Sequence, residues 1–127
     1  MSSPAECEPA TPSGRVLRLA VLASGTGSNL GAILDACRAN GFHSVNFDLI
    51  YGLPMQNLEG FGKTLETVSR MRPDRIALYS YAHMPELFKA QNRINVLALP
   101  NPALKLELFQ SAVEFLIGHG YTYIGMD

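Results

Sequence analysis

A turn of small residues at positions 24–28 follows an apolar run and precedes the first helical pattern of the chain. At the start of a helix, such a turn directs unpaired backbone N–H groups and the positive end of the helix dipole toward an anion. Gly27, Ser28 and Asn29 therefore predict a site for a small phosphate or sulfate anion. The turn contains neither Lys nor Arg, so we expect binding at this site to be weak.

The remaining candidate side chains do not form a catalytic set. His83 follows the end of a predicted strand, where α/β enzymes often place catalytic groups, but neither a nucleophile nor a second titratable partner can be placed beside it. A hydrogen-bonded structural role is therefore favoured for this histidine. His43 and His119 lie beside glycines and are expected to be solvated, and Cys37 recurs at helical spacing with leucines as a small core residue.

The composition is typical of one ordinary globular domain. Ten Lys and Arg against eleven Asp and Glu leave a net charge of -1, which gives no field to attract nucleic acid or an anionic membrane. Cys7 and Cys37 are too few for a disulfide scaffold, too far apart to suggest a metal site, and fit a reducing compartment. Neither a membrane-length apolar run nor an export signal is present, so the sequence predicts a cytoplasmic protein.

The apolar pattern divides the chain into a tail and one α/β domain. Residues 1–14 lack apolar periodicity and predict a disordered tail, whereas residues 15–127 carry the pattern of a single domain. Strands are predicted where apolar and β-branched residues run together, and helices where apolar residues recur every three or four positions. The strands are expected at 17–23, 45–51, 76–81 and 121–124, and the helices near 30–37, 58–71, 86–91 and 102–117.

Local signals fix several of these boundaries. Asn57 is predicted to cap the helix at 58–71, and Pro73 to end it. Asn101 is predicted to cap the helix at 102–117, with Pro102 at its first position. Four tyrosines alternate on the predicted strands and are expected to line the core or a cavity: Tyr79, Tyr81, Tyr121 and Tyr123.

Strands that alternate with helices indicate an α/β fold with parallel strands joined by right-handed crossovers. Four strands in chain order, with every helix outside, would form half of a βα barrel. With the first strand central, they would form a small doubly wound, flavodoxin-like sheet. The second strand favours the barrel, because one of its faces is apolar and the other is partly polar, as in a strand that lines a cavity. The apolar face carries Val45, Phe47, Leu49 and Tyr51, and the other carries Asn46, Asp48 and Ile50.

Three segments along residues 40–127 carry a family resemblance. They read Gly-Phe-His-Ser-Val-Asn-Phe-Asp-Leu-Ile-Tyr-Gly-Leu-Pro, Pro-Asp-Arg-Ile-Ala-Leu-Tyr-Ser-Tyr-Ala-His-Met-Pro and Gly-Tyr-Thr-Tyr-Ile-Gly-Met-Asp. In this order they resemble the oxygen-independent coproporphyrinogen III oxidases, radical S-adenosylmethionine enzymes of haem biosynthesis. The resemblance implies a partial βα barrel in which Asp48 and Ala82 bind S-adenosylmethionine.

Each of these two positions also has a purely structural interpretation. Asp48 would either bind a ribose hydroxyl or serve as a carboxylate that caps a loop or reaches solvent, and the structural role is favoured. Ala82 would act only through its shape and backbone.

The sequence departs from this family in its cysteines. The family holds a four-iron four-sulfur cluster on a Cys-x3-Cys-x2-Cys motif, and this chain has no such triplet. We therefore expect no iron–sulfur cluster, no metal site and no catalytic residue of the radical reaction, with S-adenosylmethionine implied as a cofactor by the resemblance alone.

Residues 19–37 resemble a different family. The run Leu-Ala-Val-Leu-Ala-Ser-Gly-Thr-Gly-Ser-Asn-Leu is similar to the opening βα unit of glycinamide ribonucleotide formyltransferase, whose loop binds the substrate phosphate. By this match Gly27, Ser28 and Asn29 are the phosphate-binding positions. The two resemblances meet near residue 40 and predict a chimera, with a formyltransferase-like unit at 15–39 and oxidase-like units at 40–127.

Three functions are compatible with these patterns. The chain is a catalytically silent α/β chimera, a weak binding module for phosphate or S-adenosylmethionine, or a haem-pathway oxidoreductase fragment that needs the rest of its enzyme. A half barrel leaves unpaired strand edges and an apolar inner face, which predicts self-association as a homodimer.

Overall fold

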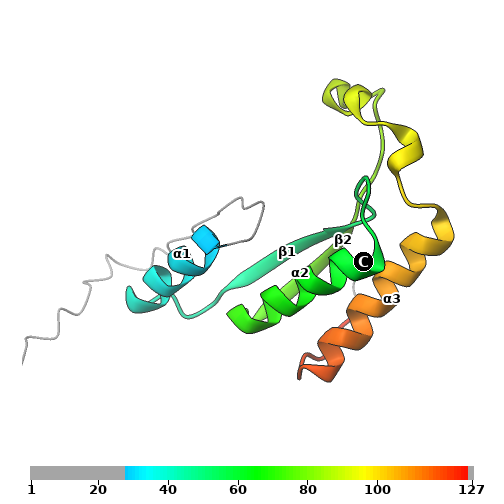
Figure 1. Cartoon of the computed structure of the whole chain (residues 1–127). Coiled ribbons are helices and arrows are strands. Elements are labelled where there is room, and N and C mark those ends of the chain that lie inside the picture. Colours follow the sequence, from blue (N-terminus) through cyan, green and yellow to red (C-terminus); the bar gives the residue numbers. More distant parts are fainter. Residues whose placement is uncertain (1–27, 126–127) are drawn as a thin grey trace, which may run out of the picture.

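The computed structural model describes residues 28–125 and has an α/β fold. Within this range it contains three α-helices, two short 3₁₀ helices and a two-stranded parallel sheet (Figure 1). The predicted tail at 1–14, the predicted strand at 17–23 and Gly27 lie outside the described residues. The elements in chain order are α1 (Ser28–Ala39), β1 (Asn46–Tyr51), α2 (Leu58–Met71), β2 (Arg75–Ser80), η1 (Lys89–Arg93), η2 (Val96–Ala98) and α3 (Pro102–Gly118).

The sheet has a regular parallel register. It begins with Asn46 opposite Arg75 and ends with Tyr51 opposite Ser80, and α2 joins the two strands. Because side chains alternate along a strand, this register gives the sheet one apolar and one mixed face. Both strands occur within a residue or two of the predicted positions.

The helix boundaries follow the predicted signals. The Asn57 side chain accepts a hydrogen bond of 2.7 Å from the Gly60 N–H, and the Asn101 side chain accepts one of 2.8 Å from the Leu104 N–H. Pro102 is the first residue of α3, where its missing N–H leaves no unsatisfied donor. Both capping predictions are confirmed.

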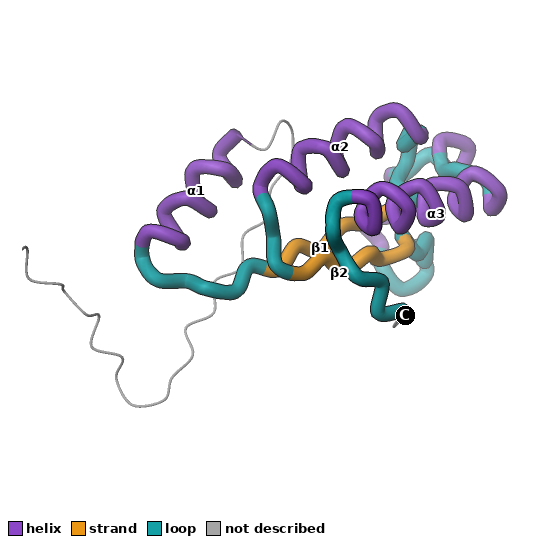
Figure 2. The backbone as a smooth tube through the Cα atoms, turned by 90° about the horizontal axis from the view of Figure 1, so that it is seen from below, coloured by secondary structure: helices purple, strands orange, loops and turns teal. Residues whose placement is uncertain are grey.

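All three helices lie on the same side of the sheet (Figure 2). The apolar face beneath them forms the core, whereas Ile50 and Tyr79 on the opposite face are 46 % and 54 % exposed. A barrel segment has its helices on one face in this way, whereas a doubly wound sheet has them on both. The half barrel itself stays a prediction, and of its four expected strands the described residues contain two. The core consists of one cluster of Phe61, Leu65, Leu108, Ala112 and Leu116 and a second of Leu34, Phe47 and Val68.

Two segments differ from the sequence-based expectation. Residues 121–125 form no strand, because their backbone makes no ladder with β2. Tyr121 is held there by its side chain, whose hydroxyl donates a hydrogen bond of 2.6 Å to the Pro73 carbonyl. The helix expected near 86–91 is instead a turn at 85–87 followed by η1. The i→i+4 hydrogen bond from the Phe88 N–H to the Met84 carbonyl is not continued, because the next bond, from the Gln91 N–H to the Phe88 carbonyl, is of the i→i+3 type of a 3₁₀ helix. Among residues 28–125, no helix is both long and apolar enough to cross a bilayer.

The Tyr121 contact predicts a pH-dependent stability. Burial, followed by the nearby Asp74 carboxylate, raises the pKa of the Tyr121 phenol above its ordinary value. Above about pH 10 the unfolded chain loses this proton before the folded chain does, so stability falls as the pH rises. Tyr121→Phe should lower the free energy of unfolding by about 1 kcal/mol at pH 8 and should flatten its decline above pH 10. Urea unfolding at both pH values measures this, and an unchanged decline in the variant would contradict it.

Candidate functional site

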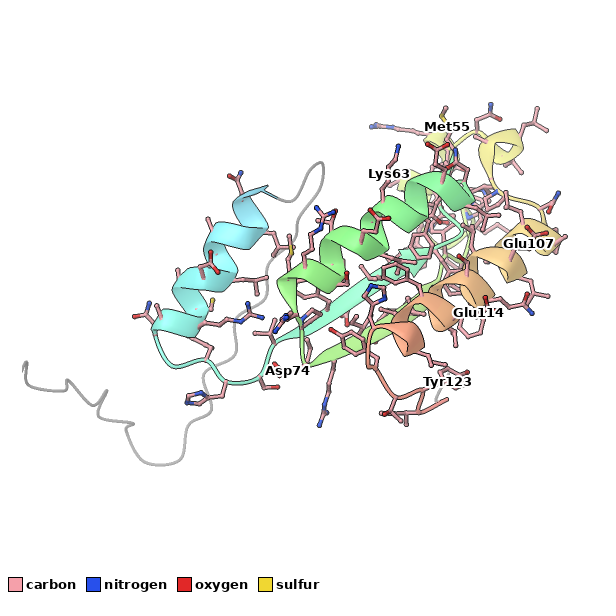
Figure 3. All side chains as sticks on the ribbon, turned by 60° about the horizontal axis from the view of Figure 1, so that its bottom comes forward. Met55, Lys63, Asp74, Glu107, Glu114 and Tyr123 are labelled. Carbon is pink, nitrogen blue, oxygen red and sulfur yellow. The ribbon has the colours of Figure 1, made fainter. Side chains whose placement is uncertain are left out.

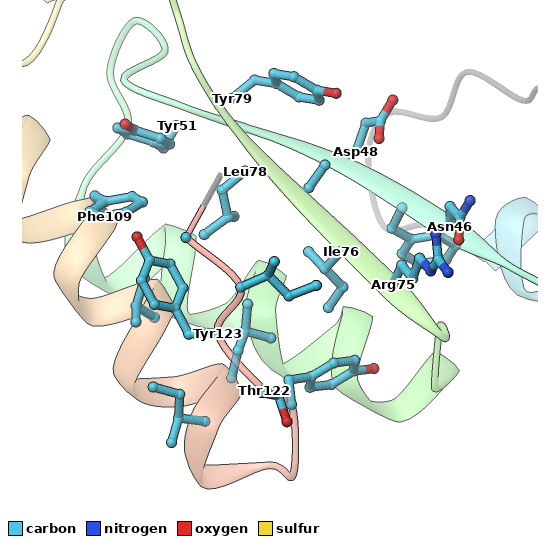
Figure 4. Close-up of a pocket in the computed structure, with 18 of the residues that line it drawn as sticks. Asn46, Asp48, Tyr51, Arg75, Ile76, Leu78, Tyr79, Phe109, Thr122 and Tyr123 are labelled. Atoms are coloured by element: carbon cyan, nitrogen blue, oxygen red, sulfur yellow. The ribbon is translucent and has the colours of Figure 1, made fainter. Parts of the chain in front are cut away.

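An open groove lies beside β2 (Figure 4). Its volume is about 1080 Å³, and its walls come from both strands, from α3 and from residues 120–125 (Figure 4). Phe109 and Tyr123 contribute aromatic side chains to it, and Tyr123 is 57 % exposed. The segment that was predicted to form the last strand therefore lines a cavity in this structure, as one interpretation of its tyrosines indicated.

Asp48 lies in the middle of β1, on the face that no helix covers. It stands opposite Ala77 in the register, and it shares its face with Tyr79, which pairs with Ile50 (Figure 4). The Asp48 side chain is exposed, and among residues 28–125 its carboxylate has no hydrogen-bond or ion-pair partner. Its oxygens are therefore available as acceptors on an open surface, and they do not cap a loop of the described chain.

Backbone groups gather at the carboxyl end of the sheet. The Tyr81 N–H donates a hydrogen bond of 2.8 Å to the Tyr51 carbonyl. This bond holds the residue after β2 against the last residue of β1. Ala82 follows as an exposed residue. Met55 marks this end of the sheet and Asp74 marks the opposite end (Figure 3).

Three polar side chains order this carboxyl end. Gln56 accepts hydrogen bonds from the Gly52 N–H at 2.7 Å and the Leu53 N–H at 3.3 Å. Gln91 accepts from the Met84 N–H at 2.6 Å and donates to the Ala82 carbonyl at 3.2 Å. The third is Lys105 of α3, whose ammonium group donates to the Tyr81 carbonyl at 2.8 Å.

The sequence interpretation did not single out these three residues. The two glutamines belong to no motif. Lys105 carried a usable signal, because it falls on the helical stripe of Leu108 and Ala112. A lysine among buried positions usually finds a polar partner.

His83 has the structural partner that its sequence context favoured. Its Nδ1 lies 3.2 Å from the Tyr81 hydroxyl in a half-buried hydrogen bond. His119 is exposed, as expected, and its ring stacks on Phe115 with 4.0 Å between ring centroids. Cys37 is half-buried on α1.

The predicted anion site is only partly described. Within the described residues α1 spans Ser28–Ala39, and Asn29 is exposed in it. No interaction of the described chain joins Asn29 to Asp48 or Ala82. Phosphate binding here stays a prediction.

The cysteines of this chain do not match the ligand set of the family's iron–sulfur cluster. Among residues 28–125 there is no group of three His, Cys, Asp or Glu side chains that could hold a metal ion. The whole sequence contains two cysteines, one fewer than the three thiolates of the family motif.

The curated proteins that this chain matches share one description. No family model matches this chain. It is 47 % identical over 95 residues to oxygen-independent coproporphyrinogen III oxidase of Pseudomonas aeruginosa, covering 75 % of this chain and 21 % of that protein. The corresponding protein of Escherichia coli is 47 % identical over 96 residues, covering 76 % and 21 %. That of Helicobacter pylori strain J99 is 50 % identical over 90 residues, covering 71 % and 20 %.

A solved structure shares the fold. It is coproporphyrinogen III oxidase (HemN) from Escherichia coli, described as a radical SAM enzyme, and it matches with a TM-score of 0.78 and 43 % identity over 82 % of this chain and 24 % of that chain. The resemblance that residues 40–127 predicted is thus confirmed. This chain spans about a fifth of the length of the curated relatives it matches. The formyltransferase resemblance and the chimera stay predictions.

Proposed function

We propose that this chain presents part of the S-adenosylmethionine-binding surface of an oxygen-independent coproporphyrinogen III oxidase. The observation that carries the proposal is the position of Asp48 and Ala82, the two residues that match the family's binding positions. Asp48 is an exposed carboxylate on the uncovered face of the sheet, and Ala82 is exposed just beyond the end of β2. Neither residue is buried in the core.

The chemistry of the two positions suits the two ends of an adenosyl group. A carboxylate accepts hydrogen bonds from the vicinal hydroxyls of a ribose, and a backbone amide can bond the edge of a base. Asp48 pairs with Ala77, and Ala82 lies five residues farther along, or about 16 Å at the rise of a strand. One ligand therefore reaches both positions only if it lies along the strands.

The radical reaction itself is not expected of these 127 residues alone. In the family, the iron–sulfur cluster supplies the electron that cleaves S-adenosylmethionine, and the cysteines present here do not fit that cluster. The proposed function is thus binding without catalysis, and the haem-pathway reaction would require the remaining parts of an oxidase.

Calorimetric titration of the full chain with S-adenosylmethionine tests the binding proposal. We expect saturable binding, and Asp48→Asn should weaken it by about tenfold or more, because hydrogen bonds to a charged acceptor are worth about 1.5–3 kcal/mol. Asp35→Asn, which removes an exposed carboxylate from α1, is the matched control and should leave the affinity unchanged. No binding by the wild type, or equal affinity in Asp48→Asn, would refute the proposal.

A separate experiment tests the absence of catalysis. Anaerobic reconstitution of the full chain with iron and sulfide should give no cluster absorbance and no cleavage of S-adenosylmethionine under reducing conditions. Cluster absorbance accompanied by cleavage would overturn this part of the proposal while leaving the binding surface in place.

A further inference from the structure

Lys105 reaches from the core-facing side of α3 to the carboxyl end of the sheet. Its ammonium group donates a 2.8 Å hydrogen bond to the Tyr81 carbonyl in a half-buried position. Its aliphatic stem passes over Gly52, where a Cβ atom would lie 2.8 Å from the Lys105 Cε and 3.3 Å from its Cδ. One side chain therefore packs on the end of β1 and bonds to the end of β2.

The bonded carbonyl belongs to the same peptide group as the Ala82 N–H. No cis peptide bond occurs in the described chain, so this carbonyl and N–H point in opposite directions in one plane. Lys105 therefore fixes the direction of the Ala82 N–H, which points away from the ammonium group. The next peptide is held as well, because Gln91 donates to the Ala82 carbonyl at 3.2 Å.

The Ala82 N–H itself is available. No acceptor for it occurs among residues 28–125, and Ala82 is exposed. A cation that bonds to the carbonyl of a peptide polarises that peptide and makes its N–H a stronger donor. The geometry thus yields an oriented, polarised and unpartnered donor at one of the two positions proposed to bind the ligand.

We infer that Lys105 is a positioning residue that orients and polarises the Tyr81–Ala82 peptide, so that the Ala82 N–H donates to an acceptor atom of the bound adenosyl group. This inference rests on the proposed function. Lys105 acts through the peptide and does not touch the ligand. A lysine that merely attached α3 to the sheet would affect stability without changing the donor strength of one amide.

Amide exchange in the ligand-free chain separates these two roles. Loss of the cation makes the Ala82 N–H less acidic, so its base-catalysed hydrogen exchange, followed by NMR, should become slower in Lys105→Met than in the wild type. Loosening of the chain would not slow an exposed amide. Lys63→Met is the control, because Lys63 pairs with Glu59 on the exposed surface of α2 at 3.1 Å. It should leave the Ala82 exchange rate unchanged.

Titration with S-adenosylmethionine completes the test. Lys105→Met should bind about fivefold to tenfold more weakly than the wild type, the effect of losing one well-formed hydrogen bond. Lys105→Arg keeps a cationic donor, should recover the exchange rate and most of the affinity, and serves as the second variant if Lys105→Met does not fold.

The outcomes separate the two proposals. A wild type that does not bind refutes the proposed function, and slower Ala82 exchange in Lys105→Met would then still establish polarisation by Lys105. Binding by the wild type with equal affinity and equal Ala82 exchange in Lys105→Met would overturn the positioning role alone.

Discussion

Leu108→Ala should lower the free energy of unfolding by about 3–5 kcal/mol, a large share of the 5–15 kcal/mol typical of a domain. Leu108 of α3 has no exposed surface and belongs to the larger core cluster, where it lies with Phe61 and Leu65. Truncation removes the transfer free energy of its side chain and leaves a cavity between α2 and α3. Because α2 and α3 pack both on each other and on the sheet, they cannot close that cavity without losing contacts to the sheet.

Urea unfolding followed by far-UV circular dichroism measures this change. The matched control is Leu97→Ala, because Leu97 in η2 is 93 % exposed and its truncation should change the free energy by less than about 0.5 kcal/mol. Equal losses in the two variants would show that α3 does not pack on the sheet as described.

Much of the described fold was predictable because local signals and burial agree. In α2, the Asn57 cap, the apolar spacing of Phe61, Leu65 and Val68, and the exit before Pro73 all indicate one helix, and the structure buries those three apolar residues. The polar face of β1 was likewise readable from alternation, since Asp48 is exposed between half-buried or buried neighbours. Each of these inferences needs only neighbours within a few positions along the chain.

The prediction of a last strand at 121–124 was wrong for a reason that composition does not show. Residues 121–124 have the β-forming composition of a strand, but a strand needs a backbone partner as well as suitable side chains. In this structure β2 pairs only with β1 among the described residues, while Tyr121 bonds to Pro73 through its hydroxyl and the following residues line the groove beside β2. Amino-acid composition does not show whether a segment will form backbone hydrogen bonds with the edge of a neighbouring strand.

Local signals in the sequence also could not predict the hydrogen bonds at the carboxyl end of the sheet. The Lys105–Tyr81 bond joins residues 24 positions apart, and nothing near Tyr81 indicates that its carbonyl receives a cation. The resemblance identified Ala82 as a binding position but not the lysine that orients its amide. Side chains that act through a peptide group leave no motif, because the atoms they fix belong to the backbone.

Gly52→Ala should destabilise the chain by about 3 kcal/mol, through two effects that can be separated. Gly52 is buried and has φ of 86°, where an L-residue costs about 1–2 kcal/mol. Its new Cβ would also displace the Lys105 stem and break the hydrogen bond to Tyr81, a charge-assisted bond worth about 1.5–3 kcal/mol. The same displacement should slow exchange of the Ala82 amide, as Lys105→Met does.

A double-mutant cycle isolates the second effect. In a Lys105→Ala background the stem is already gone, so Gly52→Ala should cost only the backbone strain of about 1–2 kcal/mol. Gly62→Ala, in the interior of α2 with no atom near its added Cβ, is the control and should stabilise the chain by about 0.5–1 kcal/mol. If Gly52→Ala costs the same with and without Lys105, the two residues are not coupled. The lysine would then not be what fixes the Tyr81–Ala82 peptide against the end of the sheet.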